Sequence, residues 1–257
     1  MKRLTQPSRL ERCCRAASRG LRQLALAIGL VFVVSATAAA EDDWAFRVSP
    51  YAWYLNIDGD FTVQELNGVD ASSTLFEDLD GAFMIEGEVS KGPYALFGEF
   101  NYIDLDQSAS AAGGFFGVDV EVEGIMTSLS AGYQLVDTGA STVHAFAGVR
   151  SWWIDTTVKF RRLQTRSVDK TWNDPIIGLR GSAEIGDGFF VDGVTDIGGF
   201  GVGSEFQWEV IGRGGYAFND YIAVAVGYRY LRVDFDENPL LLDAEFKGPF
   251  AAVDIKF

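Results

Sequence analysis

The sequence predicts an all-β protein: a closed antiparallel β-barrel that spans a membrane. Three observations predict this fold. Apolar and polar residues alternate along most of the chain, which is the period of a β-strand. The alternating segments are about as long as a tilted strand must be to cross a bilayer. The connections between them are alternately short and long, as they are in outer-membrane barrels.

Composition excludes several other classes of protein. The chain has 257 residues, a net charge of -15 and 48% hydrophobic residues, so it has enough apolar surface to fold. An acidic chain repels phosphate, and we expect no nucleic-acid partner. The single histidine, His144, excludes a multi-histidine metal site. The two cysteines, Cys13 and Cys14, are adjacent and build no disulfide framework. We expect no cofactor.

Residues 1–40 are predicted to be a cleaved secretory signal peptide. A basic stretch precedes an apolar run from Leu24 to Val34, and an Ala-x-Ala pattern ends at Ala40. A membrane anchor is the alternative, but the apolar run is too short to cross the hydrocarbon layer. Cleavage removes both cysteines and the whole basic stretch, which leaves residues 41–257 as an acidic barrel domain.

Period-two alternation places large apolar residues on one face of each predicted strand. Phe83, Ile85 and Val89 share a face, opposite Glu86 and Glu88. The predicted strands lie near residues 44–57, 81–91, 93–106, 118–136, 141–160, 174–186, 188–198, 204–218, 220–235 and 241–257. This gives ten strands, or eight if two pairs of segments merge.

The connections support an outer-membrane topology. Short turns are predicted at 91–93, 137–140, 186–188 and 219–220, and longer loops at 58–80, 107–117, 161–173, 199–203 and 236–240. An even strand count puts both termini of the barrel's chain on the periplasmic side. The last strand ends on Phe257, in phase with its apolar face. Such a terminal aromatic resembles the signal that outer-membrane assembly machinery recognises, and we expect that machinery as a partner.

Lipid offers the backbone no hydrogen-bond partners, so the strands must close into a barrel. Aromatic residues near the strand ends are predicted to form girdles at the two membrane interfaces. They are Tyr51, Trp53, Tyr54, Tyr102, Trp152, Trp153, Trp208, Tyr216, Tyr228 and Tyr230. Simple β-propensity of aromatic residues is the alternative interpretation.

Charged residues on the opposite phase are predicted to face the interior. They are Arg47, Glu86, Glu88, Glu99, Arg150, Arg180, Glu184, Asp192, Asp196, Glu209, Arg213, Arg229, Asp254 and Lys256. Both signs are present, so these side chains can pair with one another. A ten-stranded barrel is only slightly wider than one that side chains fill. We therefore expect a mostly plugged polar core, with a thin water path as the alternative, and favour a structural role over a selectivity filter.

The predicted strand 118–136 does not keep its apolar residues on one face throughout. Val118, Val120 and Val122 are out of phase with Ile125 and the apolar residues that follow it. Gly124 lies at the break. Either a β-bulge at this glycine or a strand that leaves the membrane above it would explain the switch.

The predicted outer loops differ in charge. Acidic residues gather in 58–80 and 234–237, without the spacing of a known calcium loop, so a solvated acidic surface is the simpler interpretation. The segment after residue 158 is basic instead: Lys159, Arg161, Arg162, Arg166 and Lys170. Arginine suits phosphate, so this loop is predicted to contact lipopolysaccharide, or alternatively to pair with the acidic loops.

Catalysis has little support in the sequence. A barrel hydrolase needs a base, usually histidine, and His144 lies close to a predicted periplasmic turn. We favour a place in the core or at the interface for this residue. The glycine-rich stretch 198–203 is predicted to be a sharply bent hairpin rather than a phosphate-binding loop, because no helical segment follows it.

Four segments resemble a widespread group of uncharacterised Gram-negative outer-membrane β-barrel proteins. They are Ser49–Gly59 (SPYAWYLNIDG), Asp196–Ser204 (DIGGFGVGS) with Trp208, Gly227–Leu231 (GYRYL) and Gly248–Phe250 (GPF). The resemblance covers the chain after the signal peptide, and the glycine-rich stretch is its most specific part. It implies a porin-like barrel in the outer membrane and carries over no catalytic residue.

Three functions are compatible with the sequence. The first is a non-enzymatic envelope protein, either structural or a narrow passive channel, with membrane lipid and lipopolysaccharide as partners. The second is a surface binding or adhesion module that acts through loops 58–80 and 161–173. The third, least favoured, is a lipid-modifying outer-membrane enzyme.

Overall fold

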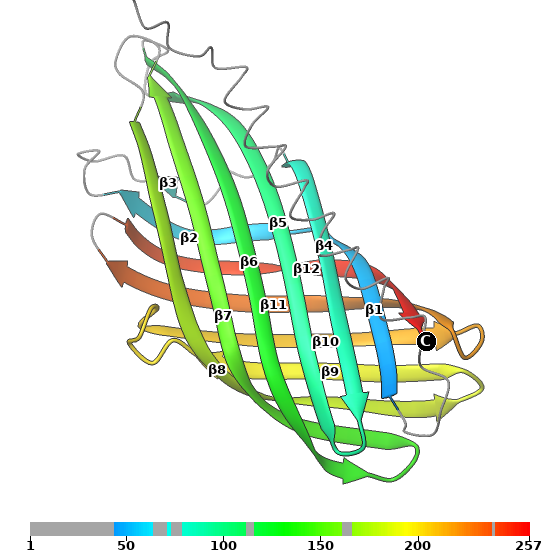
Figure 1. Cartoon of the computed structure of the whole chain (residues 1–257). Helices are drawn as coiled ribbons and strands as arrows, with labels where there is room; N and C mark the ends of the chain where they lie inside the picture. Colours follow the sequence, from blue (N-terminus) through cyan, green and yellow to red (C-terminus); the bar gives the residue numbers. More distant parts are fainter. Residues whose placement is uncertain (1–43, 64–70, 73–78, 112–115, 161–165, 238–239) are drawn as a thin grey trace, which may run out of the picture. The chain divides into compact units, whose positions relative to one another are not determined.

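A computed structural model describes residues 44–63, 71–72, 79–111, 116–160, 166–237 and 240–257 (Figure 1). The predicted signal peptide lies outside the described residues. These residues form β-strands joined by turns. In this part of the chain, no helix is long and apolar enough to cross a membrane.

The described chain is a closed antiparallel barrel of ten strands, as predicted. The ten positions in its wall are built from twelve strand segments: β1 (Trp44–Trp53), β2 (Asn56–Val63), β3 (Ala71–Ser72), β4 (Leu79–Lys91), β5 (Tyr94–Ala111), β6 (Phe116–Asp137), β7 (Ser141–Phe160), β8 (Arg166–Gly186), β9 (Phe189–Gly198), β10 (Phe206–Ala217), β11 (Ile222–Glu237) and β12 (Leu240–Lys256). From β4 to β12 each strand pairs with its neighbours in the sequence, as in an up-and-down barrel.

The barrel closes between the first and last strands. β1 pairs with β4 on one side and with β12 on the other. β1 and β2 both pair with β12. Trp53 lies opposite Phe250 and Asn56 lies opposite Lys247, so the two segments pair with β12 in one continuous register. β1 and β2 therefore occupy one position in the wall. β3 only adds a short pairing to β2.

All four short turns lie at one end of the barrel, together with both ends of the described chain. The turns occupy residues 92–93, 138–140, 187–188 and 218–221. At the same end the backbones of Phe46 and Phe257 exchange hydrogen bonds of 3.0 and 3.1 Å. Outer-membrane barrels have their short turns in the periplasm, so this is the periplasmic end.

A continuous apolar belt covers the outer face next to this end. Large apolar side chains such as Leu129, Ile185 and Val226 point outward, each with about two thirds of its surface exposed (66%, 66% and 67%). On β7 the belt runs from Val143 to Trp153. About ten tilted residues cover the ~25 Å apolar band of an outer-membrane barrel. A closed barrel with this belt spans a bilayer, and single-chain bacterial barrels of this kind occupy the outer membrane.

Above the belt, the two faces of the longer strands exchange their polarity. On β11, Val226 and Tyr228 are exposed to lipid, whereas Arg232 and Asp234 are the outward residues further up. The inward face changes in the opposite sense, from Arg229 to Leu231, Val233 and Phe235, which are 1%, 0% and 1% exposed. The upper part of the wall is therefore built like that of a water-soluble protein, because both its surroundings and its core have changed.

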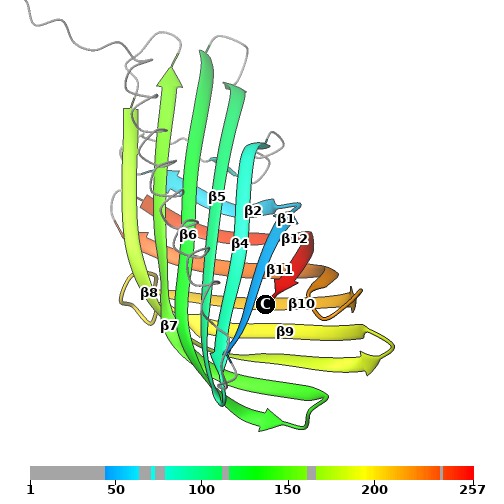
Figure 2. The ribbon, with the colours of Figure 1, turned by 45° about the vertical axis from the view of Figure 1, so that its right-hand side comes forward.

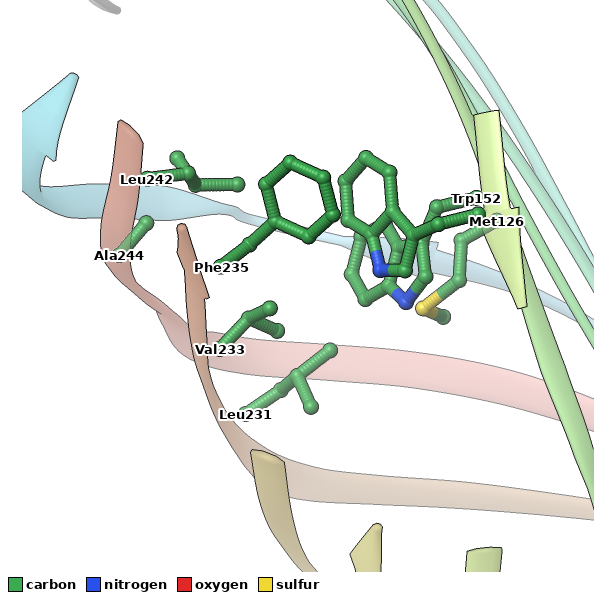
Figure 3. Close-up of a cluster of buried hydrophobic side chains, with 8 residues drawn as sticks. Met126, Trp152, Leu231, Val233, Phe235, Leu242 and Ala244 are labelled. Atoms are coloured by element: carbon green, nitrogen blue, oxygen red, sulfur yellow. The ribbon is translucent and has the colours of Figure 1, made fainter. Parts of the chain in front are cut away.

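The inward apolar residues of the upper wall form one cluster. Trp152 of β7 faces Phe235 and Leu242 of β11 and β12 from the opposite wall (Figure 3). Trp172 of β8 belongs to the same cluster. The Trp172 ring stacks on Phe235 with centroids 4.2 Å apart, and on Trp152 at 5.5 Å. Above the membrane, two walls of the barrel thus pack face to face through this aromatic cluster.

The same exchange explains the phase conflict at Gly124. β6 keeps an unbroken register through this residue, with Ile103 opposite it on β5 and Ile154 on β7. The β-bulge that was one of the two predictions is therefore wrong. Val122 lies on the inward phase and Glu123 on the outward phase because β6 leaves the lipid here, which is the other prediction.

Apart from the hairpin between β9 and β10, the outer connections are shorter than predicted because the strands continue above the membrane. β8 begins at Arg166, although the sequence predicts its start near residue 174, and β5 runs to Ala111 rather than to residue 106. Only residues 161–165 separate β7 from β8. Figure 2 shows β5 to β8 rising together as one tall sheet, while β9 and β10 are short.

Three aromatic residues predicted for the girdles face the interior instead. Trp53 and Trp152 are each 5% exposed, and the Tyr51 hydroxyl lies 2.6 Å from both Glu99 Oε1 and Asn101 Oδ1 in the interior. Tyr54 and Trp153, their neighbours in the sequence, point outward with 73% and 40% exposed. A pair of adjacent aromatic residues must place one ring on each face of a strand. The inward rings are those that share the phase of the interior arginines Arg47 and Arg150.

The glycine-rich stretch forms the predicted bent hairpin between β9 and β10. Gly199 and Gly201 have φ values of +86° and +70°, which glycine adopts without steric cost. The hairpin is held against β8 by the buried carboxylate of Asp174. This carboxylate accepts hydrogen bonds from the backbone N–H and the hydroxyl of Ser204 at 2.6 and 2.7 Å, and from Trp172 Nε1 at 3.0 Å.

A row of carboxylates crosses the outer face just above the belt. Glu123, Asp155 and Asp169 lie directly opposite one another on β6, β7 and β8. Partial burial raises the pKa of Asp155, and the neighbouring carboxylate of Asp169 raises it further. Like charges placed side by side on a sheet oppose folding.

The polarity exchange predicts that a water-soluble reagent reaches the outward face of β7 above the belt but not within it. We expect a cysteine in place of Asp155 to react with a membrane-impermeant maleimide on intact cells. A cysteine in place of Val149, on the same outward face but within the belt, is expected to stay unlabelled. Neither native cysteine follows residue 40, so the signal is specific. Equal labelling at the two positions would contradict the position of the membrane boundary.

The row of carboxylates predicts that Asp155→Asn increases the stability of the folded chain by an amount that depends on pH. The folded state binds the Asp155 proton more tightly than the unfolded chain, so stability falls as the pH rises above the ordinary aspartate pKa, about 3.9. The variant should therefore unfold at a higher urea concentration than the parent chain at pH 7, with the difference disappearing near pH 4. Urea titrations in detergent without divalent cations measure this, and a variant that is no more stable at pH 7 refutes it.

Candidate functional site: the interior of the barrel

The interior consists of three levels. A cavity of about 650 Å³ opens at the periplasmic end. Above it, arginine and carboxylate side chains fill the barrel at the depth of the lipid belt. The aromatic cluster around Trp172 closes the upper part. Any function that involves passage or binding inside the barrel depends on the middle level.

Arg150 of β7 organises one part of the middle level. Its guanidinium donates two hydrogen bonds to Asp196 on β9, at 3.1 and 3.0 Å, and one to Glu209 on β10, at 2.5 Å. A further bond of 3.3 Å reaches Gln207. Arg150 is 1% exposed and Glu209 is 2% exposed. Buried charges are stable in a protein only when they are paired and hydrogen-bonded in this way.

Arg229 of β11 extends this network across the barrel. It donates to Glu209 through Nε at 2.5 Å and forms a close ion pair with Glu99 of β5. It also donates to the Tyr51 hydroxyl at 2.8 Å. Its guanidinium lies 4.8 Å from the centre of the Trp53 ring, within cation–π range. Glu209 thus accepts from two arginines, and the chain of pairs joins opposite walls.

A second group of pairs lies nearer the periplasmic cavity. Arg47 reaches Glu86 at 3.1 Å and Glu88 at 2.5 Å. Arg213 pairs with Asp192 at 2.6 Å and with Asp254 at 2.9 Å.

Two further contacts complete this group. Arg180 forms a close ion pair with Glu86, which therefore serves two arginines. The Ser49 hydroxyl donates to Asp254 at 2.6 Å. Each of the five predicted interior arginines is therefore bonded to a carboxylate on another strand.

Aromatic rings packed on glycines support the arginines from the wall. A Cβ on Gly132 would lie 2.7 Å from the Phe97 ring, so only glycine lets this ring lie flat on the neighbouring strand. The Arg180 guanidinium lies 4.9 Å from the centre of that ring. The same arrangement recurs where Phe190 lies on Gly215. These glycines make room for rings that separate the charges from the wall.

The periplasmic cavity contains the remaining predicted interior charges. Glu184 and Lys256 line it, and Lys256 Nζ lies 6.0 Å from the centre of the Phe190 ring. His144 also lines it, packed edge-on against Phe97 at 5.9 Å and only 9% exposed. No hydrogen bond to His144 is found among the described residues, and in the same part of the chain no group of three metal-binding side chains is arranged around an ion.

The cavities described in the middle level are small. The cavities found there have volumes of about 20 and 40 Å³ and are lined by Glu86, Glu99 and Arg180 among others. A cavity of this size holds one or a few water molecules.

Buried donors mark the upper limit of this level. Asn101 Nδ2, Trp152 Nε1 and Gln207 Nε2 are buried and have no partner among the described atoms. They lie between the ion pairs and the aromatic cluster, where an ordered water would satisfy them.

The residues predicted to contact lipopolysaccharide are not all at the outer surface. Lys170 is in β8 with its ammonium 5.7 Å from the centre of the interior Phe235 ring. Lys159 and Arg166 lie at the upper ends of β7 and β8. Arg161 and Arg162 lie outside the described residues, and contact with lipopolysaccharide stays a prediction.

Several uncharged residues of the network could not be singled out from the sequence. Tyr51 and Gln207 bond charged groups, and Asn101 bonds Tyr51, but a tyrosine or an amide on the inward phase carries no signal of its own. Ser49 likewise is one of many small polar residues. The usable signal is the inward position of each in its strand, two residues away from a charge or an aromatic ring.

Comparison with known proteins gives structural likenesses only. No family model and no curated protein matches the chain. The translocator domain of the autotransporter NalP from Neisseria meningitidis is 12% identical, with 96% of this chain and 98% of that chain covered and a TM-score of 0.46. Ail, the attachment invasion locus protein of Yersinia pestis, is 10% identical, with 84% and 100% covered and a TM-score of 0.40. A major outer membrane protein from Thermus thermophilus is 10% identical, with 84% and 100% covered and a TM-score of 0.41.

The buried network predicts a large loss of stability when Arg150 is removed. Arg150→Ala leaves Asp196 and Glu209 buried without this partner, so we expect a loss of about 3–5 kcal/mol. Reversible urea unfolding in lipid vesicles measures it. Arg232→Ala is the matched control, because Arg232 pairs with Asp243 at 3.0 Å on the exposed upper wall and should cost less than about 1 kcal/mol. Equal losses in the two variants would contradict the role of the network.

Proposed function

We propose that the protein is a non-conducting, non-enzymatic barrel of the outer membrane, a structural scaffold whose extended strands stand outside the lipid. The observation that carries this proposal is the filled middle level. Between the periplasmic cavity and the aromatic cluster, the described cavities measure only about 20 and 40 Å³. Hydrated ions and solutes need a continuous wider path, so the structural alternative is favoured over the passive channel.

The arrangement of the charges supports the same proposal. A selectivity filter uses charges that face water and can exchange ions. Here Arg150, Glu209 and Arg229 are bonded to one another and are at most 2% exposed. Their geometry suits a plug that holds opposite walls together.

Non-enzymatic function is proposed because the one histidine has no catalytic surroundings in the described chain. A hydrolytic base needs an orienting partner and a nucleophile or water within hydrogen-bond reach. His144 contacts the Phe97 ring instead and faces the periplasmic cavity. His144→Gln is expected to leave envelope lipid composition unchanged.

Electrical recording tests the closed barrel. The folded chain in planar bilayers is expected to show no ion-conducting steps. A variant with Arg150, Glu209, Trp152 and Trp172 all changed to Ala lacks parts of the ion-pair network and of the aromatic cluster, and it should conduct. Heat-modifiable migration on gels checks that both proteins are folded. Regular conductance steps from the unmodified chain would overturn the proposal.

A further inference from the structure

The upper part of β8 has a neighbour on only one side. β8 pairs with β7 from Arg166, opposite Val158, down to Ala183. It pairs with β9 only from Ile176 downward, because β9 ends at Gly198. In both views β8 lies at the margin of the tall sheet (Figures 1 and 2). The stretch above residue 176 is therefore an edge strand.

Two hydrogen bonds show which backbone groups face this edge. The Pro175 carbonyl accepts from the N–H of Gly199, on the side away from β7. The N–H of Glu184 donates to Ala140, on the β7 side. In an antiparallel strand both groups of a residue point to the same side and successive residues alternate. The N–H and C=O groups of Ser167, Asp169 and Thr171 thus point away from β7.

The hairpin between β9 and β10 covers only the lowest part of the edge. It contacts β8 through Gly199 and Ser204, which bond Pro175 and Asp174. In the ranges that the structure describes, no backbone group pairs with Ser167, Asp169 or Thr171 on this side. An edge of this kind is a template for another strand.

The edge opens at the level where the surroundings become aqueous. The outward residues Ile177 and Leu179 belong to the lipid belt, with 49% and 47% exposed. The outward residues above them are polar: Asn173, Thr171 and Asp169. An open edge cannot exist in lipid, but in water it can accept a partner.

We propose that this edge, Ser167 to Thr171 of β8, binds an extended segment of another protein by β-strand addition, outside the cell. The backbone groups of the three outward residues supply the hydrogen bonds, and the side chains beside them select the sequence.

The two faces of the edge define the chemistry of the partner. On the outer face an added strand lies beside Asp169, at the end of the carboxylate row through Asp155 and Glu123. On the inner face it lies beside Lys170 and Trp172 and near the Phe235 ring, which both of these side chains contact. A strand in which basic residues alternate with apolar ones complements both faces at once.

Peptide binding to the folded full-length chain tests the inference. The probe is a fluorescent peptide in which Lys and Val alternate over seven residues. One control peptide carries the same residues in blocks, and another carries backbone N-methyl groups at alternate positions, which removes hydrogen bonds but keeps the charge. Only the alternating, unmethylated peptide is expected to bind. Equal binding of the methylated peptide would show simple charge attraction and overturn the proposal.

A variant of the edge itself gives the sharper test. Thr171→Pro removes an N–H that points away from β7, so the ladder with β7 keeps its bonds. We expect at least a tenfold weaker affinity for the alternating peptide. Thr171→Val keeps the N–H and should bind within twofold of the parent chain. Equal affinity of the proline and valine variants, with unchanged heat-modifiable migration, would overturn the proposal.

Amide exchange distinguishes a free edge from one that the chain itself covers. In the unliganded protein the amides of Ser167, Asp169 and Thr171 should exchange fast and become protected when the alternating peptide is added. Protection of these amides without peptide would mean that a loop of the same chain already occupies the edge, which would overturn the inference. These readouts do not depend on conductance, so they are independent of the proposed closed barrel.

Discussion

The absence of hydrogen-bond partners in hydrocarbon is the constraint on which the whole structure depends. Within the belt every strand has a neighbour on both sides, and β1 closes the circle by pairing with β4 and β12. The constraint ends where lipid ends. The pairing of β8 with β9 stops at Ile176, close to the level at which the outward side chains become polar. The wall is complete where it must be and opens only where water can satisfy the backbone.

The side chains exchange their polarity at the same level, where the lipid ends. In the belt, apolar groups face out and ion pairs such as Arg150–Asp196 fill the centre. Above it, Arg232 and Asp243 face out while Val233 and Leu242 pack inside. The strands do not change their twofold alternation at this level. A single strand such as β11 therefore serves as a membrane strand in one half and as a strand of a soluble sandwich in the other.

Much of this architecture is predictable from the sequence because alternation and turn residues are local signals. The ten strands, the four short turns and the hairpin after Gly198 are confirmed. The height of the wall is not predictable in the same way. Residues 166–173 resemble a loop because their outward positions are polar, yet they continue β8. Trp152 shows a second limit: an aromatic ring carries no signal of its own for lipid or interior, so this residue is predicted for a girdle although it shares the inward phase of Arg150 and packs against Trp172.

The interior ion pairs also constrain the order in which the chain can enter the bilayer. Arg229 lies 130 positions from its partner Glu99, and Arg150 lies 59 positions from Glu209. A hairpin or half-barrel from the first strands would carry these charges into hydrocarbon without their partners, at a cost of several kcal/mol for each ion. Stepwise insertion of hairpins is therefore unfavourable. The strands must meet first, in a hydrated and sheltered environment, and insertion and closure become a single cooperative event.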